Sequence, residues 1–224
     1  MLLLQFSTSH YCRKARLALG YKQIPYQVEN LTPGLHILRV KPLTGLSTLP
    51  VLLPQRPDKP RAIADSTAIY RYLEAQQPEP SYYPADPILC TQAECWEDWL
   101  DESIGTATRF VYYHFRAGAG RALDSSWFSQ AIINVVRAQY GIQETAVQRA
   151  GDRLQLALRV LAPWQNQPYL IGSSPTIADL TAAALLSPLA LIPQYRQQVP
   201  WLFARVREIH QLCREPLPPG LVEQ

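Results

Sequence analysis

The chain has 224 residues, a mass of 25.3 kDa and 47% hydrophobic residues, which is enough for two modest domains or one large one. Its net charge of +3 and pI near 8.7 are only mildly basic, so the composition does not indicate a nucleic-acid-binding protein. The four cysteines, Cys12, Cys90, Cys95 and Cys213, have neither metal-ligand spacing nor the pattern of a disulfide framework, which favours a reduced, cytoplasmic setting. The apolar run after Met1 is too short for a signal peptide, and no stretch reads as a membrane span.

The first segment combines a short apolar run with a helix-like pattern. Residues 2–6 are apolar and strand-like, polar residues follow, and apolar residues then recur at helical spacing up to Leu19. This pattern predicts a buried strand that runs through a turn into a helix, whose first N–H groups are unpaired. Such a helix start carries partial positive charge and suits an anion such as a thiolate. Ser9 places a hydroxyl there, three residues before Cys12.

A proline precedes the next apolar run, Val51 to Leu53. Pro50 can open a strand but cannot lie in the middle of one, and a proline here is a candidate for a cis peptide bond. Leu49 would then present its backbone N–H and C=O to an extended peptide, as an added strand does. The alternative is that Pro50 opens its strand in trans and contacts no ligand.

Residues 65–75 predict a helix with Ile69, Tyr72 and Leu73 on one apolar face. Asp65 and Ser66 lie where this helix starts. A hydroxyl and unpaired N–H groups there can bind a carboxylate, and the Asp65 carboxylate can bind an ammonium, so the pair suits an amino-acid head group. The alternative is that both residues only cap their helix.

The chain changes character near residue 76. Before it, strand-like runs (2–6 and 50–53) alternate with helical ones (11–20 and 65–75), which is typical of an α/β unit with parallel strands. Residues 76–87 contain four prolines and are predicted to form a linker. Helical periodicity then covers most of the remaining chain, at residues 89–117, 126–139, 142–162, 176–192 and 200–213.

The helix predicted at 176–192 carries its own start and stop signals. Thr176 with Asp179 three residues later fits a capping box, and Pro188 should kink or end the helix. We therefore predict a domain at residues 1–76, a linker at 77–88 and an all-helical domain at 89–224.

Four motifs in this order resemble those of the cytosolic glutathione transferases. They are S-x-x-C-R-K-x-R-x-A-L at residues 9–19, L-P-V-L at 49–52, A-D-S-T-A-I-x-x-Y-L at 64–73 and T-I-A-D-L at 176–180. Ser9 is similar to the serine-type classes, theta and zeta, and the N-terminal half resembles bacterial and cyanobacterial members. The resemblance implies a thioredoxin-like α/β domain followed by an all-α helical bundle, a cytoplasmic homodimer, and conjugation of glutathione to small hydrophobic electrophiles in detoxification.

The resemblance also implies roles for individual residues. Ser9 would stabilise the glutathione thiolate, and no metal or other cofactor would be needed beyond glutathione as co-substrate. Glutathione would contact a set of residues from the three N-terminal motifs: Thr48, Leu49, Pro50, Asp65 and Ser66. The electrophile pocket would be lined by side chains at the first helix and in the long helix at 89–117: Tyr11, Arg109, Tyr112, Tyr113 and Phe115. Three residues compete for the glycine carboxylate of glutathione: His36, Arg39 and Lys41.

The chain departs from the family pattern at residues 41–50, which run longer than the usual segment, and Thr48 stands where a lysine is common. Other functions also stay open. Cys12 could form a mixed disulfide in glutathione-dependent thiol–disulfide exchange, although a cysteine one turn into a helix usually packs as a small buried hydrophobe. Alternatively, Ser9 is only a helix cap and the chain is a non-catalytic binding or scaffold protein.

Overall fold

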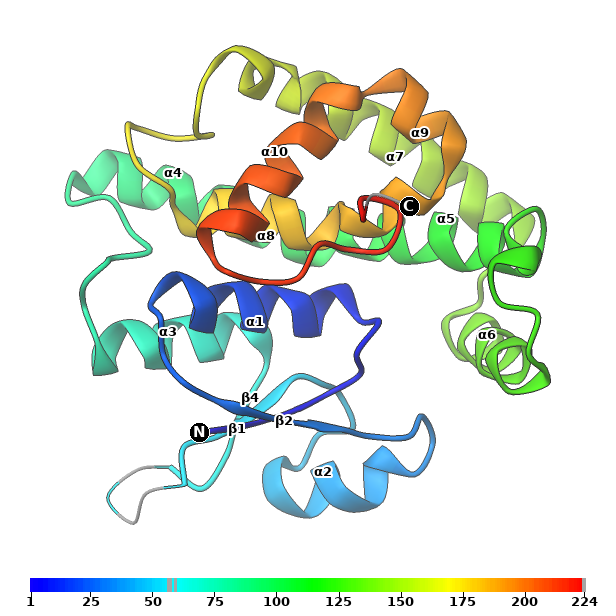
Figure 1. The fold of residues 1–224 in the computed structure, drawn as a ribbon, viewed down its shortest axis with the longest axis horizontal. Helices are drawn as coiled ribbons and strands as arrows, with labels where there is room; N and C mark the ends of the chain where they lie inside the picture. Colours follow the sequence, from blue (N-terminus) through cyan, green and yellow to red (C-terminus); the bar gives the residue numbers. More distant parts are fainter. Residues whose placement is uncertain (56–57, 59, 223–224) are drawn as a thin grey trace.

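The computed structural model describes residues 1–55, 58 and 60–222, and its elements form a sheet layer below a set of helices (Figure 1). The strands are β1 (Leu2–Gln5), β2 (Gln27–Asn30), β3 (Val51–Leu53) and β4 (Ile63–Ala64). The α-helices are α1 (His10–Tyr21), α2 (His36–Thr44), α3 (Ser66–Gln76), α4 (Pro87–Asp98), α5 (Gly105–Ala117), α6 (Trp127–Tyr140), α7 (Glu144–Leu161), α8 (Ile177–Leu185), α9 (Pro193–Gln198) and α10 (Pro200–Leu212). A π-helical segment (Trp99–Ile104) joins α4 to α5, and 3-10 helices lie at Arg121–Leu123, Ala162–Asn166 and Ser187–Leu191.

The strands form one sheet in the order β2-β1-β3-β4. Strand β1 pairs in parallel with β2, a strand that is not among the predicted elements, with Leu3 opposite Val28. The prediction of parallel pairing is wrong for β3 and β4, because β3 runs antiparallel to β1 and to β4. The connection from β3 to β4 contains no helix within the described residues, and a direct connection of this kind suits an antiparallel pair.

Helices α1 and α3 cover one face of the sheet and α2 covers the other, while the C-terminal helices lie beyond α1 (Figure 1). Helix α1 is therefore enclosed between the sheet and the C-terminal helices. Its apolar residues are fully buried, and so are three cations, Arg13, Lys14 and Arg16. Buried cations require partners, and these partners prove to connect α1 to the rest of the molecule.

The predicted continuous helix at 89–117 is interrupted by the π-helical segment. In that segment the Gly105 N–H donates to the Leu100 carbonyl, five residues earlier, instead of the usual four. The predicted helix at 176–192 ends earlier, at Leu185, and a 3-10 turn containing Pro188 follows it, so the predicted effect of this proline is confirmed. The predicted capping box is also confirmed: the Thr176 N–H donates to the Asp179 carboxylate at 2.8 Å.

The two halves of the chain share one hydrophobic core. Leu17 of α1 and Ile69 of α3 belong to the same buried cluster as Leu180 and Leu185 of α8. The structure confirms the predicted architecture of a small α/β layer followed by helices, whereas the boundaries 1–76, 77–88 and 89–224 stay a prediction.

The proline-rich linker is attached to the end of α1 by Lys22. The buried Lys22 ammonium donates to the carbonyls of Gln77, at 2.5 Å, and Pro80, at 2.8 Å, and pairs with the Glu74 carboxylate at 2.8 Å. It also lies over the Tyr82 ring. One cation therefore satisfies linker carbonyls that would otherwise be left without donors.

Candidate functional site

Ser9 lies at the N-cap of α1, as its position in the sequence predicts. Its backbone is extended (φ −73°, ψ 126°), and its Oγ accepts a hydrogen bond from the Cys12 N–H at 3.3 Å. The Ser9 N–H donates to the Phe6 carbonyl at 3.1 Å, which closes the turn after β1. The hydroxyl therefore caps the helix as an acceptor and still carries a proton that it can donate to a sulfur atom at the helix start.

Leu49 and Pro50 lie directly before strand β3, as predicted, and the peptide bond between them is cis. Pro50 is buried, Leu49 is half-buried and Thr48 is exposed. Antiparallel pairing begins at the next residue, Val51, which lies opposite Leu4. Leu49 thus precedes the paired part of β3, where its backbone groups are placed to meet an extended peptide.

The three candidates for the glycine carboxylate differ in their partners. His36 accepts from the Gly34 N–H at Nδ1, at 3.1 Å, and its Nε2 donates to the Ser47 carbonyl at 3.0 Å. Arg39 pairs with the Glu29 carboxylate at 3.5 Å in an exposed position. Lys41 is exposed and forms no ion pair with a described residue, which makes it the most available cation of the three.

Asp65 and Ser66 start α3, as predicted. Asp65 is exposed and has a φ of +80°, an unusual backbone conformation for a residue other than glycine, and such strain is concentrated at functional sites. Its Oδ1 accepts from the N–H groups of Thr67, at 2.9 Å, and Ala68, at 3.0 Å. The prediction that the N–H groups here are unpaired is therefore wrong for these two residues. Within the described chain, the Ser66 N–H and hydroxyl form no hydrogen bond and can bind a carboxylate.

A buried charge cluster lies beneath the start of α3, and the sequence does not indicate it. The Lys14 ammonium of α1 bonds to the carboxylates of Glu97 and Asp101, and Thr67 accepts from Lys14 at 3.1 Å and donates to Glu97 at 2.6 Å. Burial raises the pKa of Asp101, the Lys14 charge opposes this, and the charges of Glu97 and Asp65 add to the rise. Because the charge of Asp65 acts on Asp101, negative charge gathers near the start of α3, which favours a bound cation such as an amino-acid ammonium.

The π-helical segment holds the first turn of α1. The Tyr11 hydroxyl donates to the Asp101 carbonyl at 2.7 Å, and His10 Nε2 lies 3.1 Å from the Gly105 carbonyl. A Cβ at Gly105 would lie 2.6 Å from the Tyr11 hydroxyl, so only glycine permits this approach. An isolated glycine within a predicted helix is the one sequence signal that could have indicated this close contact.

Burial determines the protonation of the residues that follow Ser9. It lowers the pKa of His10 to about 3, with help from the charges of Arg109 and Arg13, so the ring is neutral at physiological pH. It raises the pKa of Tyr11 to about 12, so the phenol stays protonated. Neither side chain can then act as an acid or base in the neutral pH range.

The side chains predicted for the electrophile pocket do not form one group. Arg109 of α5 lies over the Tyr11 ring, with 5.1 Å from the guanidinium carbon to the ring centroid. Tyr112 accepts from Arg116 at 3.1 Å and makes an edge contact with Tyr113. Phe115 points elsewhere, because six residues along an α-helix turn its side chain by about 240° from that of Arg109.

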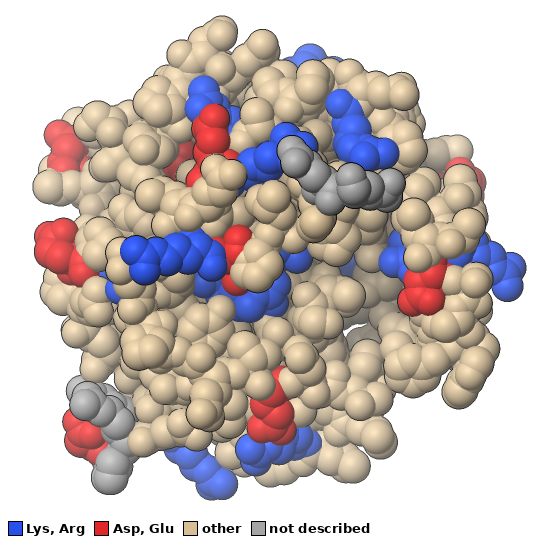
Figure 2. Space-filling view, in the orientation of Figure 1, with Lys and Arg blue, Asp and Glu red and all other residues tan. Residues whose placement is uncertain are grey.

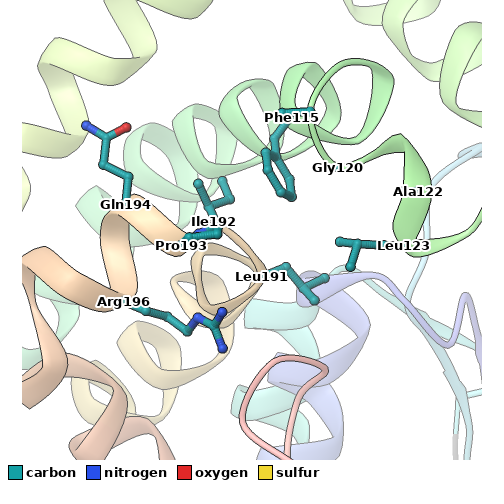
Figure 3. A pocket seen from close by; sticks show the side chains of 10 residues that line it. Phe115, Gly120, Ala122, Leu123, Leu191, Ile192, Pro193, Gln194 and Arg196 are labelled. Atoms are coloured by element: carbon teal, nitrogen blue, oxygen red, sulfur yellow. The ribbon is translucent and has the colours of Figure 1, made fainter.

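Phe115 instead lines a separate cavity of about 580 Å³ (Figure 3). The figure shows its ring facing the side chains of Leu123, Leu191 and Ile192, which come from two segments between α5 and α9. Figure 2 shows a further hollow in the face seen in Figure 1, between the N-terminal layers and α6, with Lys, Arg, Asp and Glu side chains scattered around it.

Cys12 has no access to solvent. Its side chain is fully buried, and burial raises the pKa of its thiol. Thiol–disulfide exchange requires an accessible thiolate, so the Cys12 alternative lacks its reactive group. Among the described residues, no group of three His, Cys, Asp or Glu side chains could hold a metal ion, and no helix is long and apolar enough to cross a membrane.

Ser9, the Leu49–Pro50 pair and the Asp65–Ser66 pair all lie within the part of the chain that matches a known domain family. Residues 3–81 match the family described as the glutathione S-transferase N-terminal domain. The N-terminal part of the chain is therefore similar to the N-terminal domain of glutathione S-transferases. A probable glutathione S-transferase of Nicotiana tabacum, parA, is 25% identical over 173 residues, which cover 75% of this chain and 73% of that protein.

Solved structures of glutathione S-transferases are similar over nearly the whole chain. One from Xanthobacter autotrophicus has a TM-score of 0.73 at 21% identity and covers 98% of this chain and 97% of that chain. Another, from Methylobacterium radiotolerans in complex with glutathione sulfonate, has a TM-score of 0.70 at 22% identity and covers 98% and 92% of the two chains. The predicted glutathione transferase fold, a thioredoxin-like domain followed by helices, is confirmed.

Proposed function

We propose that this protein is a glutathione S-transferase of the serine type, which conjugates the glutathione thiolate to small hydrophobic electrophiles. The observation that carries the proposal is the position of Ser9, whose hydroxyl lies at the N-terminus of the buried helix α1. Fold and family alone do not determine the reaction, so the proposal depends on this residue.

Ser9 would act on the ionisation of the glutathione thiol. The thiolate is the nucleophile, and a free thiol is mostly protonated at neutral pH. The hydroxyl proton of Ser9 and the partial positive charge of the α1 start both stabilise the thiolate. A decrease of about two pKa units corresponds to roughly 2.7 kcal/mol.

The remaining glutathione contacts would come from the motifs already described. The Leu49 backbone would pair with the peptide, with Pro50 and Thr48 beside it. Ser66 would bind the γ-glutamyl carboxylate, and Asp65 the neighbouring ammonium, which the negative charge near the start of α3 also favours. We retain the expectation of a cytoplasmic homodimer with no cofactor other than glutathione as co-substrate.

The chemical step needs no further group. The thiol proton passes to solvent, the thiolate sulfur attacks the electrophilic carbon, and a carbon–sulfur bond forms as the leaving group departs with its electron pair. Placing the thiolate next to the electrophile supplies most of the rate enhancement, because the reaction becomes effectively unimolecular.

The test is the ultraviolet absorbance of bound glutathione thiolate against pH. In the natural protein the bound thiol should ionise below neutral pH, and Ser9→Ala should return its pKa towards that of free glutathione. Ser9→Gly separates catalysis from capping, since glycine caps a helix almost as well as serine but has no hydroxyl. Ser7→Ala, an exposed serine in the same turn, is the matched control and should change nothing.

If the pKa of bound glutathione equals that of free glutathione in both the natural protein and Ser9→Gly, Ser9 is only a helix cap. Absence of glutathione binding would instead favour the non-catalytic alternative. Conjugation of a chloronitroarene, followed by absorbance of the product, completes the assay.

A further inference from the structure

Arg109 is placed between two aromatic rings from different helices. Its guanidinium carbon lies 5.1 Å from the ring centroid of Tyr11 in α1 and 4.4 Å from that of Tyr140 at the end of α6. Both distances are within the range of a cation–π interaction. A cation–π contact does not use the N–H groups of the guanidinium as donors to an acceptor atom, so these groups stay available for a carboxylate.

The Arg109 donors have no carboxylate partner among the described residues. Some other arginines of the chain are paired: Arg16 contacts Glu215 at 2.6 Å, Arg205 contacts Glu208 at 2.6 Å, and Arg39 contacts Glu29. What sets Arg109 apart is its position against Tyr11 at the start of α1. Arg109 forms no ion pair or hydrogen bond within the described chain, although it is half-buried. A half-buried guanidinium with unused donors suits a carboxylate, whose two oxygens can accept both N–H groups of its edge.

Arg109 also lies next to the proposed reactive sulfur. Tyr11, which it contacts, is two residues from Ser9 and in the first turn of the same helix. Its charge is felt at His10, the residue after Ser9, where it contributes to lowering the pKa. Because His10 is neutral, Arg109 is the cation that a molecule bound beside Ser9 and against Tyr11 would meet.

The surroundings also restrict the body of the ligand. Tyr113 and Tyr140 are close enough to Arg109 to interact electrostatically with each other and with it, and burial raises the pKa of Tyr113 to about 12, so its phenol stays neutral. Aromatic walls favour a flat apolar body through stacking. A ligand that satisfies both the walls and the guanidinium is an aromatic or conjugated carboxylate.

We propose that Arg109 recognises a carboxylate on the electrophile, so that the preferred substrates are flat, apolar electrophiles that carry one anionic group. This inference rests on the proposed transferase function and specifies its substrate class. The carboxylate would bind the guanidinium edge, which orients the electrophilic carbon towards the sulfur held at Ser9. Arg109 does not take part in bond formation, and the bonds that form and break are those of the conjugation step.

The experiment compares two electrophiles of similar shape but different charge, 4-chloro-3-nitrobenzoate and 4-chloro-3-nitrobenzamide. Because the amide activates the ring more strongly than the carboxylate, each kcat/KM is first divided by the rate constant of the uncatalysed reaction with glutathione. In both, the sulfur replaces chloride. The natural protein should have a kcat/KM for the benzoate on the order of tenfold or more above that for the benzamide, which is the discrimination expected of charge-assisted hydrogen bonds. In Arg109→Gln the ratio should fall to about one, mainly through an increase in KM for the benzoate.

Arg116→Gln is the matched control, because it removes the same charge from the same helix. Its guanidinium is already engaged by Tyr112 and by Ser129, at 3.1 and 3.4 Å. The ratio should be unchanged in this variant. Arg109→Lys covers the case in which Arg109→Gln does not fold: the charge remains but the planar fork is lost, so the ratio should fall several-fold.

Two results would overturn the inference: a ratio near one in the natural protein, or an equal fall in Arg116→Gln. A separate binding arm covers the failure of the transferase function. Calorimetric titration with 4-methyl-3-nitrobenzoate, which lacks a leaving group, needs no reaction. If neither electrophile is conjugated but this benzoate binds better than its benzamide, and only while Arg109 is present, the carboxylate site stands and the transferase function fails. If it does not bind, the site is refuted as well.

Discussion

Replacing Lys14 by methionine should strongly destabilise the protein. The Lys14 side chain has no exposed surface, and the side chains of its partners Glu97 and Asp101 are only 7% and 9% exposed. Methionine retains most of the apolar volume but leaves two buried carboxylates without a cation. Removing one partner from a buried ion pair costs about 3–5 kcal/mol, because the remaining charge is uncompensated.

The cost should also depend on pH, since burial raises the pKa of Asp101 and the Lys14 charge opposes that rise. Without Lys14 the folded-state pKa increases further above its unfolded value. Protonation of Asp101 then supports the fold at low pH, and this support is lost as the pH rises through the folded-state pKa. The deficit of Lys14→Met should therefore be smaller at pH 5 than at pH 8.

Urea denaturation followed by circular dichroism at both pH values measures this deficit. Lys41→Met, at an exposed lysine with no ion pair to a described residue, is the control and should remain within about 0.5 kcal/mol of the natural protein. A deficit for Lys14→Met below about 1 kcal/mol, or one that does not change with pH, would refute the reasoning that the cluster is a buried network.

Three further changes test other parts of the structure. Burial raises the pKa of Asp179 to about 6, so its protonation stabilises the fold below about pH 4, and this contribution is lost as the pH rises through 6. In urea denaturation, the free energy of unfolding lost in Asp179→Ala should therefore be larger at pH 4 than at pH 7, by on the order of 3 kcal/mol. Gly105→Ala places a Cβ 2.6 Å from the Tyr11 hydroxyl and should cost about 1–3 kcal/mol in a thermal melt together with much of the conjugation rate, whereas Gly151→Ala, in a helix with nothing within 4 Å, should be neutral or stabilising. In the folded protein, an aromatic disulfide reagent should modify Cys95, which is exposed, and leave Cys12 intact until the chain unfolds; rapid modification of Cys12 would restore the thiol–disulfide alternative.

Local rules located the features that depend on a few consecutive residues. The N-caps at Ser9 and Asp65 and the capping box at Thr176 and Asp179 follow from the preference of short polar side chains for unpaired N–H groups. The proline at residue 50 likewise indicated the end of a loop and a cis bond. Each of these requires only the sequence within one helical turn.

Elements that depend on tertiary contacts could not be predicted from the sequence. Strand β2 reads Gln-Val-Glu-Asn and has little hydrophobic patterning, because it is an edge strand held by backbone pairing to β1. Helix α2 contains Pro42 and α9 has only six residues, so neither has a strong helical period. Both were absent from the predicted elements.

The site itself could be predicted only in part. Arg109 and Tyr11 were both expected to line the electrophile pocket, and they do lie together. Their contact with Tyr140 joins α5 to the end of α6, and no periodicity shows which helices become neighbours. The carboxylate partners of Lys14 are more than 80 residues away in the chain, so the buried cluster could be found only after folding.

Helix α1 is fastened at both ends. At its start, Tyr11 is bonded to the Asp101 carbonyl, and at its end Lys22 collects the carbonyls of the linker. The helix whose start carries Ser9 is therefore anchored at both ends, and the linker is anchored to its C-terminal end. The position of the Ser9 turn is therefore set jointly by the π-helical segment and by the linker, two parts of the chain that lie far from it in sequence.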